Sequence, residues 1–172
     1  MLTYVYCMPL WQIMFIMALL VVLWFFGSRR FDRRVWQVWN GFVVAVSIGV
    51  VLRATLLFRE PTERRVAMLP FHGLAEALVQ PQTELYRTWL MNVFLFVPLG
   101  LSLPFLLPDK IPHKVVLTVA LAAALSLLIE YLQYRYALGY CETDDVIMNT
   151  LGALIGSISY ILYSKWIKTK SK

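Results

Sequence analysis

The sequence predicts an all-α integral membrane protein, a bundle of five transmembrane helices. Of its 172 residues, 60% are hydrophobic and 15% are charged, and the mean hydropathy is +0.67. Soluble domains usually have about 25% charged residues. A helix needs about 20 apolar residues to cross about 30 Å of hydrocarbon. Five stretches meet this requirement, at residues 9–27, 35–58, 88–107, 114–134 and 146–164.

The first stretch follows no basic segment and precedes no small-residue cleavage site, so we expect a retained helix rather than a signal peptide. The longest connection, 59–87, leaves no room for a separate soluble domain. Residues 1–172 are therefore expected to form a single membrane domain.

The 59–87 connection is expected to contain a short interfacial helix. Pro70 can open this helix, and Phe71 is the first residue of its apolar face. His72 and Glu76 fall on the other face, where we interpret them as solvated polar residues, because two ligands do not make a metal site. No metal and no cofactor are predicted.

The basic residues predict the orientation of the helices. Ten of the sixteen Lys and Arg residues lie in 28–34, in 108–114 and in the tail after Ser164, on one side of the membrane if the helices alternate. The positive-inside rule then places the N-terminus outside and the C-terminus in the cytoplasm. Because these residues flank the spans, the net charge of +6 indicates topology and not nucleic-acid binding.

Polar residues of four expected helices fall at similar depths near the outer surface. At 1.5 Å of rise per residue, Arg53 and Glu130 lie about 6–8 Å from the outer ends of their helices. Asn92 and Asn149 lie about one turn inside theirs. A carboxylate at the bilayer centre costs roughly 2.5–3.5 kcal/mol, so Glu130 needs a partner or a function.

The same helices carry stripes of small and polar residues at helical spacing. Such stripes predict close helix packing at depth, opening into a polar pocket near the outer surface. They are Gly41, Ala45, Gly49 and Arg53; Ala122, Ser126, Glu130 and Gln133; and Asp145, Asn149, Gly152 and Gly156.

Two interpretations of this polar layer are open. In one, Arg53 and Glu130 neutralise each other between helices, and Asn92 and Asn149 make interhelical hydrogen bonds. In the other, the layer is an outward-facing ligand site with a fixed cation and a carboxylate. We favour the site, because the polar groups exceed what packing requires and intramembrane ionisable residues are functional by default.

The sequence contains few other features that predict a disulfide or a catalytic site. Cys7 and Cys141 both fall on the expected outer side, so a disulfide is topologically possible. The sequence has no nucleophile elbow, phosphate-binding loop or HExxH motif. Glu130 and Asp145 therefore remain as the candidate general bases.

Four segments resemble the VanZ-like family, small membrane proteins linked to glycopeptide (teicoplanin) resistance in Gram-positive bacteria. The resemblance covers roughly residues 35–164, and the family's polar positions match Asn92, Glu130, Gln133, Asp145 and Asn149. Many members have an Arg a few residues before the acidic pair, where this chain has Gly139 or Tyr140; Arg135 or Arg53 is the candidate replacement. The four segments are MLPF (68–71), NVFLFVPLG (92–100), SLLIEYLQ (126–133) and DDVIMNTLGALIG (144–156).

The resemblance implies a protein of the bacterial plasma membrane that lowers susceptibility to teicoplanin. We expect membrane lipids and a lipid-linked cell-wall precursor or a glycopeptide as partners, bound in the outer pocket. The alternatives are an enzyme that modifies an envelope lipid, with Glu130 or Asp145 as general base, and, ranked last, a proton-coupled transporter. The candidate ligand-binding residues are Arg53, Asn92, Glu130, Gln133, Arg135, Asp144, Asp145 and Asn149.

Overall fold

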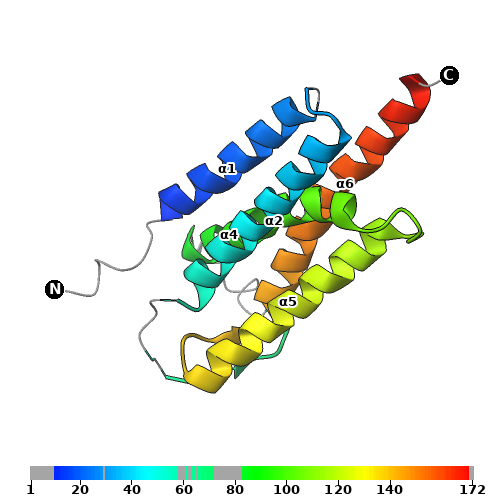
Figure 1. Ribbon diagram of the computed structural model, residues 1–172. Coiled ribbons are helices and arrows are strands. Elements are labelled where there is room, and N and C mark those ends of the chain that lie inside the picture. The colour runs from blue at the N-terminus through cyan, green and yellow to red at the C-terminus, as the bar shows by residue number, and fades with distance from the viewer. Residues whose placement is uncertain are drawn as a thin grey trace.

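The described chain is mostly helical, as Figure 1 shows. The computed structural model describes residues 10–28, 30–57, 61, 63, 64, 66–71 and 83–170. Within these residues the chain has five helices and two very short strands, which confirms the all-α class. In chain order they are α1 (Leu10–Gly27), α2 (Arg33–Thr55), β1 (Val66–Ala67), α4 (Thr83–Leu106), α5 (Lys114–Tyr136), β2 (Cys141–Glu142) and α6 (Thr143–Lys170).

Four of the described helices, α2, α4, α5 and α6, are long and apolar enough to cross a membrane. The remaining helix, α1, is apolar but has only 18 residues. At 1.5 Å per residue it is about 27 Å long, slightly less than the hydrocarbon core. The five helices are thus where the sequence predicts them, and a fifth span through α1 stays a prediction.

Two helices extend beyond the predicted apolar stretches by more than two residues at one or both ends. α4 begins at Thr83 rather than at residue 88, and α6 continues to Lys170 rather than 164. Hydropathy marks only the part of a helix that suits hydrocarbon, whereas residues such as Glu, Lys and Arg also favour helices in water. As a consequence, Asn92 lies more than two turns inside α4, not one turn inside as predicted.

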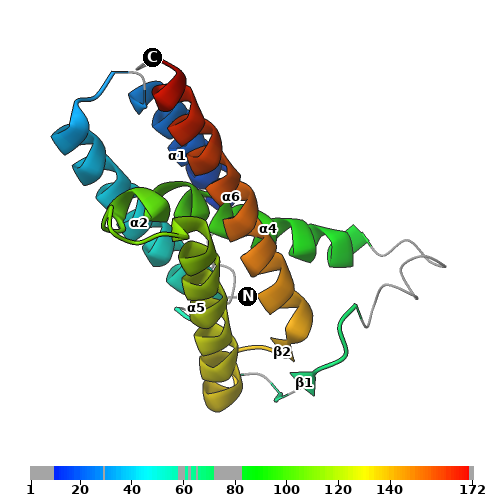
Figure 2. The same cartoon turned by 90° about the vertical axis from the view of Figure 1, so that its right-hand side faces the viewer.

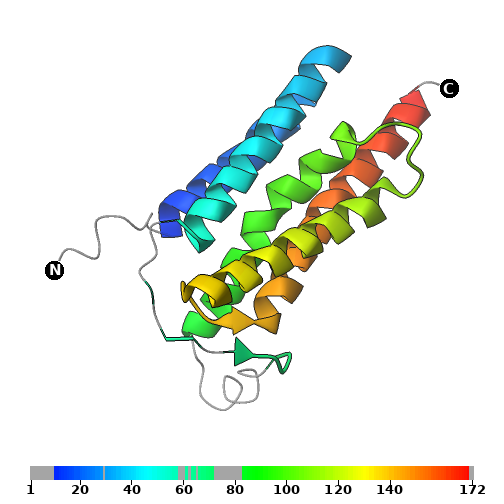
Figure 3. The ribbon, with the colours of Figure 1, turned by 60° about the horizontal axis from the view of Figure 1, so that its bottom comes forward.

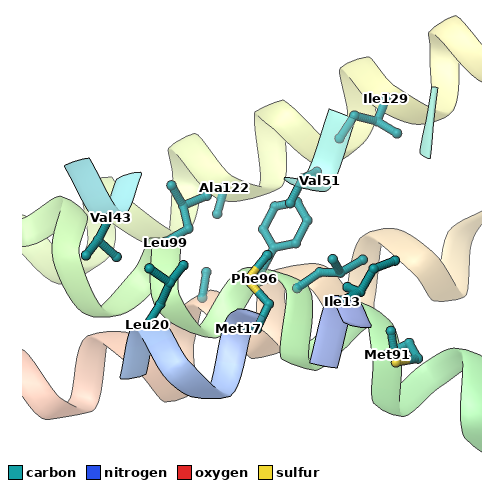
Figure 4. Packing of buried hydrophobic residues seen from close by; sticks show 12 residues of the cluster. Ile13, Met17, Leu20, Val43, Val51, Met91, Phe96, Leu99, Ala122 and Ile129 are labelled. Atoms are coloured by element: carbon teal, nitrogen blue, oxygen red, sulfur yellow. The ribbon is translucent and has the colours of Figure 1, made fainter. Parts of the chain in front are cut away.

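The helices alternate in direction, so one end of the bundle gathers the ends of α2 and α5 and the beginnings of α1, α4 and α6 (Figure 3). α4 is the central helix: it packs most extensively against α6 and also contacts α1, α2 and α5 (Figure 2). The core along α4 is apolar, with Phe96 against Met17 of α1 and Val51 of α2 (Figure 4). Which end faces the cytoplasm stays a prediction.

Glycines allow α4 and α6 to approach each other at backbone distance. A Cβ atom on Gly152 would overlap the carbonyl of Val93, and one on Gly156 would overlap the carbonyl of Val97. On the α4 side, a Cβ atom on Gly100 would overlap the backbone of Ala153. The prediction of a small-residue contact on α6 is confirmed, and α4 is its partner.

A proline in α4 is compensated at the same contact. Pro104 has no N–H, so the carbonyl of Gly100, four residues earlier, loses its usual helical donor. The Ser157 hydroxyl lies 3.1 Å from the Gly100 oxygen and 2.8 Å from the Ala153 oxygen. Ser157 is completely buried. It supplies a donor at a depth where water cannot.

The predicted packing role of the small stripe on α2 is wrong. A Cβ atom on Gly41 or Gly49 would meet no atom of the described chain within 4 Å outside the helix itself, and Ala45 is exposed. The buried face of α2 is instead the stripe Trp36, Asn40, Val43, Ser47, Val51 and Thr55. Side chains of this face, and not the glycines, pack towards α1 and α4.

The segment before α4 forms a strand contact that the sequence did not predict. β1 pairs in parallel with β2, with Val66 opposite Cys141 and Ala67 opposite Glu142. Phe71 follows in a turn with φ 57°, so it is not in the right-handed helix predicted to start at Pro70. The rest of that predicted helix, including His72 and Glu76, lies outside the described residues.

Candidate functional site

Most of the candidate residues lie at one end of the bundle, which we call the polar end. It is the end where α2 and α5 finish and α4 and α6 begin. Hydrogen bonds between helices connect its side chains, which belong to α4, α5 and α6. Its residues are Asn92, Glu130, Gln133, Asp144, Asp145 and Asn149.

Asn92 and Asp145 join α4 to α6. The Asn92 amide Nδ2 donates to Asp145 Oδ1 at 2.6 Å. Asp145 belongs to the first turn of α6, where unpaired backbone N–H groups and the helix dipole favour a negative charge. The bond is charge-assisted and therefore stronger than a neutral amide contact.

Glu130 is buried near the end of α5 and accepts a hydrogen bond from the next helix connection. The backbone N–H of Glu142 donates to Glu130 Oε2 at 2.9 Å. α5 ends at Ala137 in the left-handed conformation, with φ 54°, which turns the chain back so that Glu142 reaches the carboxylate. The Glu130 carboxylate is thus fixed by the backbone N–H of Glu142 as well as by its position in α5.

Gln133 joins α5 to the end of α2. Its Nε2 donates to the carbonyl of Thr55 at 3.1 Å, a carbonyl that has no helical donor because α2 ends there. Arg53 lies half-buried two residues before Thr55, and Glu130 lies one turn before Gln133. The structure thus brings the ends of α2 and α5 together, whereas the Arg53–Glu130 ion pair stays a prediction.

Two buried oxygen atoms at the polar end have no hydrogen-bond partner among the residues that the structure describes. They are Oε1 of Gln133 and Oδ1 of Asn149, on side chains that are 4% and 3% exposed. The orientation of the Gln133 amide is fixed, because the Thr55 carbonyl accepts only from its nitrogen. The Asn149 amide donates from Nδ2 to Ser126 Oγ at 2.8 Å. Both of these unpaired atoms are acceptors, and the indole N–H of Trp89 is a buried, unpaired donor at the same end among the described residues.

Asp144 holds the segment 66–71 over the start of α6, a role that the sequence did not reveal. Its Oδ1 accepts from the backbone N–H of Phe71 at 2.6 Å, and the neighbouring Thr143 hydroxyl donates to the Met68 carbonyl at 3.0 Å. A left-handed residue other than Gly costs roughly 1–2 kcal/mol, and these bonds help to offset that cost at Phe71.

Arg135 is not brought into the interior of the polar end. It lies in the last turn of α5 with an exposed side chain, 5.8 Å from the centre of the Tyr136 ring. Its carbonyl lies 3.4 Å from the guanidinium of Arg64. Arg135 is therefore placed at the rim, next to the segment 66–71.

The acidic groups do not form a metal-binding cluster in the part of the chain that the structure describes. Asp144, Asp145 and Glu130 each accept a hydrogen bond from a different protein donor. The chemistry that these contacts show is the binding of hydrogen-bond donors.

The comparison with known families decides what kind of protein this is. The family described as VanZ/LLP1 matches residues 13–164, which include all five helices in large part. The chain belongs to the VanZ/LLP1 family. No curated protein and no solved structure matches it. Membership in VanZ/LLP1, together with four long apolar helices, makes the chain a VanZ-like membrane protein.

Cys141 of this VanZ-like protein lies at the polar end, where two carboxylates affect its thiol. Partial burial raises the pKa of its thiol above the ordinary value of 9.0, and the nearby charges of Glu130 and Asp145 raise it further. A protonated thiol is a poor nucleophile, so Cys141 is not activated for catalysis at neutral pH. No disulfide joins Cys141 to another residue that the structure describes, and Cys7 lies outside those residues.

We expect Glu130→Gln to increase the reactivity of Cys141. Removing the Glu130 charge lowers the pKa of the thiol, and the thiolate fraction at pH 8 rises. The rate of alkylation by iodoacetamide, measured in a Cys7→Ser background, should increase severalfold. Asp109→Asn, which removes a carboxylate from the opposite end, is the control and should leave the rate unchanged. Equal rates in Glu130→Gln and the parent would mean that the two groups do not interact.

Proposed function

We propose that the polar end of this protein faces the outer leaflet of a bacterial plasma membrane and binds a lipid-linked cell-wall precursor or a lipoglycopeptide. Binding there lowers susceptibility to teicoplanin-type antibiotics. The observation that carries this proposal is the pair of buried oxygens on Gln133 and Asn149 that have no partner in the described part of the chain. Buried polar groups are nearly always hydrogen-bonded, so exceptions call for an explanation such as a ligand.

The chemistry of the polar end favours a ligand rich in hydrogen-bond donors. Glu130, Asp145 and the two amide oxygens all accept, whereas one N–H of the Asn92 amide and one of the Gln133 amide are already bonded to protein oxygens. Sugar hydroxyls and ammonium groups match such a surface, and both proposed ligand classes carry sugars. Arg53, half-buried at the end of α2, is the candidate contact for an acidic group, and the apolar helix faces suit a lipid tail.

The segment 66–71 controls how a ligand reaches these acceptors. It covers the first turn of α6 through the Phe71–Asp144 and Met68–Thr143 hydrogen bonds and the β1–β2 pairing. These contacts are few and lie at the surface, so the segment opens at a lower cost than the helices. A head group enters when it opens.

The test is teicoplanin tolerance together with direct binding. We expect Gln133→Leu to abolish the protection that the parent gives a susceptible Gram-positive host. Its affinity for teicoplanin in lipid nanodiscs should fall by about tenfold, as loss of one buried hydrogen bond predicts. Gln37→Leu, the same change at an exposed position of α2 near the opposite end, is the matched control. A folded Gln133→Leu protein that protects and binds like the parent would refute the proposal.

An enzyme that modifies an envelope lipid is the second candidate, because the charges of both Glu130 and Asp145 act on the Cys141 thiol and raise its pKa. A general base is lost in Glu130→Gln while the shape of the site is kept. The enzyme interpretation predicts that this variant still binds ligand and forms no product, as measured by mass spectrometry of lipids incubated with the purified protein. The binding interpretation predicts that no product forms with the parent either.

A further inference from the structure

A groove lies between α1 and α6 at the end of the bundle opposite the polar end. It has a volume of about 290 Å³. Trp24 and Phe25 form one wall, and Leu162, Tyr163 and Trp166 form the other; a serine from each side completes the lining. Pockets for whole small molecules usually have about 300–1,000 Å³, so this groove fits a slender apolar segment.

Aromatic rings pack against the outer side of the groove walls and fix their positions. Trp24 lies 5.2 Å from Trp36 and 5.8 Å from Phe105, measured between ring centres, and Tyr163 stacks on Trp36 at 6.1 Å. The indole N–H of Trp24 donates to the buried Asn40 at 3.0 Å, which fixes the ring. Such a wall cannot collapse into the groove without breaking these contacts, so the groove is preformed.

Basic residues lie close in sequence to residues that line the groove, Arg30 to Ser28 and Lys165 to Trp166. Arg30 and Arg34 are exposed in the connection to α2 and in its first turn, and Lys165 is exposed next to Trp166. Arg33 is also there, but it binds Asp109 at 2.7 Å. Of the acidic residues that the structure describes, only Asp32 and Asp109 belong to this end. An apolar groove whose mouth is cationic complements a molecule with an acyl chain and an anionic head.

We propose that the groove binds one acyl chain of an anionic phospholipid, whose phosphate is held by Arg30 and Lys165. Basic pockets between helices at the cytoplasmic side of a membrane are suited to such head groups. Aromatic residues at this depth favour the boundary between hydrocarbon and head groups. The site is separate from the polar end, and it does not depend on the function proposed there.

The first test compares two lipids that differ only in the head group. The probes are phosphatidylglycerol and phosphatidylcholine with identical acyl chains, added to the purified full-length chain in mild detergent and counted by native mass spectrometry. We expect one phosphatidylglycerol to be retained in preference to phosphatidylcholine. Lys165→Gln should weaken this retention about fivefold, the factor for one basic side chain at an anionic surface. Arg64→Gln at the polar end is the control and should change nothing.

The second test separates a lipid in the groove from lipids attracted by charge alone. Ser159→Phe fills the groove and keeps every basic residue, so retention of phosphatidylglycerol should be lost. The unmodified chain gives an independent readout: phosphatidylglycerol with brominated acyl chains should quench the fluorescence of Trp24 and Trp166, and should quench a Trp24→Phe/Trp166→Phe variant less. Equal retention of both lipids, retention unaffected by Ser159→Phe, or equal quenching in that double variant would each overturn the proposal.

Discussion

Replacing Gly152 by Ala should lower the melting temperature of the protein by several degrees, although it adds only one methyl group. The new Cβ would overlap the Val93 carbonyl of α4, and backbone cannot move aside as a flexible side chain can. Overpacking usually costs about 1–3 kcal/mol. For a protein of this size, a cost near 2 kcal/mol lowers the melting temperature by about 4–8 °C. Circular dichroism in detergent measures the change, and Gly156→Ala should behave in the same way.

Gly49→Ala is the matched control for this prediction. It adds the same methyl group to the interior of a helix, but no atom of the described chain outside that helix lies within 4 Å of the new Cβ. Ala is favoured over Gly inside a helix by about 0.5–1 kcal/mol, so the melting temperature should stay constant or rise. If Gly49→Ala and Gly152→Ala destabilise the protein equally, close packing of α4 and α6 is not what makes Gly152 necessary.

The glycines also show what the sequence could and could not predict. Hydropathy located all five helices, because an apolar stretch long enough to cross a membrane is typical of a transmembrane helix. Small-residue spacing predicted a close contact correctly for α6 and wrongly for α2, although Gly41 and Gly49 lie on one helix face just as Gly152 and Gly156 do. The spacing of small residues along a helix shows only that a second helix could approach it closely. Whether a helix makes that approach depends on the partner, which is distant in sequence.

Five residues of the polar end were predicted to lie together, and the interhelical hydrogen bonds expected of Asn92 and Asn149 are present. Other contacts of the polar end were not predicted. Depth and face placed Asn92, Glu130, Gln133, Asp145 and Asn149 near one another, since both follow from helix geometry. The contact between Asp144 and the backbone of Phe71 was not predicted. It connects residues 73 positions apart through a backbone N–H, and every residue except proline has such a group, so the sequence carries little signal for it.

The Asn92–Asp145 bond should give the largest measurable coupling between α4 and α6. Asn92→Leu removes the amide that donates at 2.6 Å to the Asp145 carboxylate. Hydrogen bonds to charged groups contribute about 1.5–3 kcal/mol. We therefore expect the melting temperature in detergent to fall by about 4–10 °C for a chain of this size. Asp145→Leu should also destabilise the protein, because it leaves the Asn92 amide without its acceptor.

The double variant Asn92→Leu/Asp145→Leu decides whether these two losses are one interaction. Replacing both members of a buried polar pair by apolar residues of similar size is far milder than removing one, because no uncompensated charge remains. The two single losses should then exceed the double loss by about 1–3 kcal/mol, the range for residues in direct contact. Strictly additive losses would show that the two side chains stabilise α4 and α6 separately. A stable double variant can also be used to test the function of the pair. If this variant protects a host against teicoplanin like the parent, the pair holds the helices together and takes no part in the site.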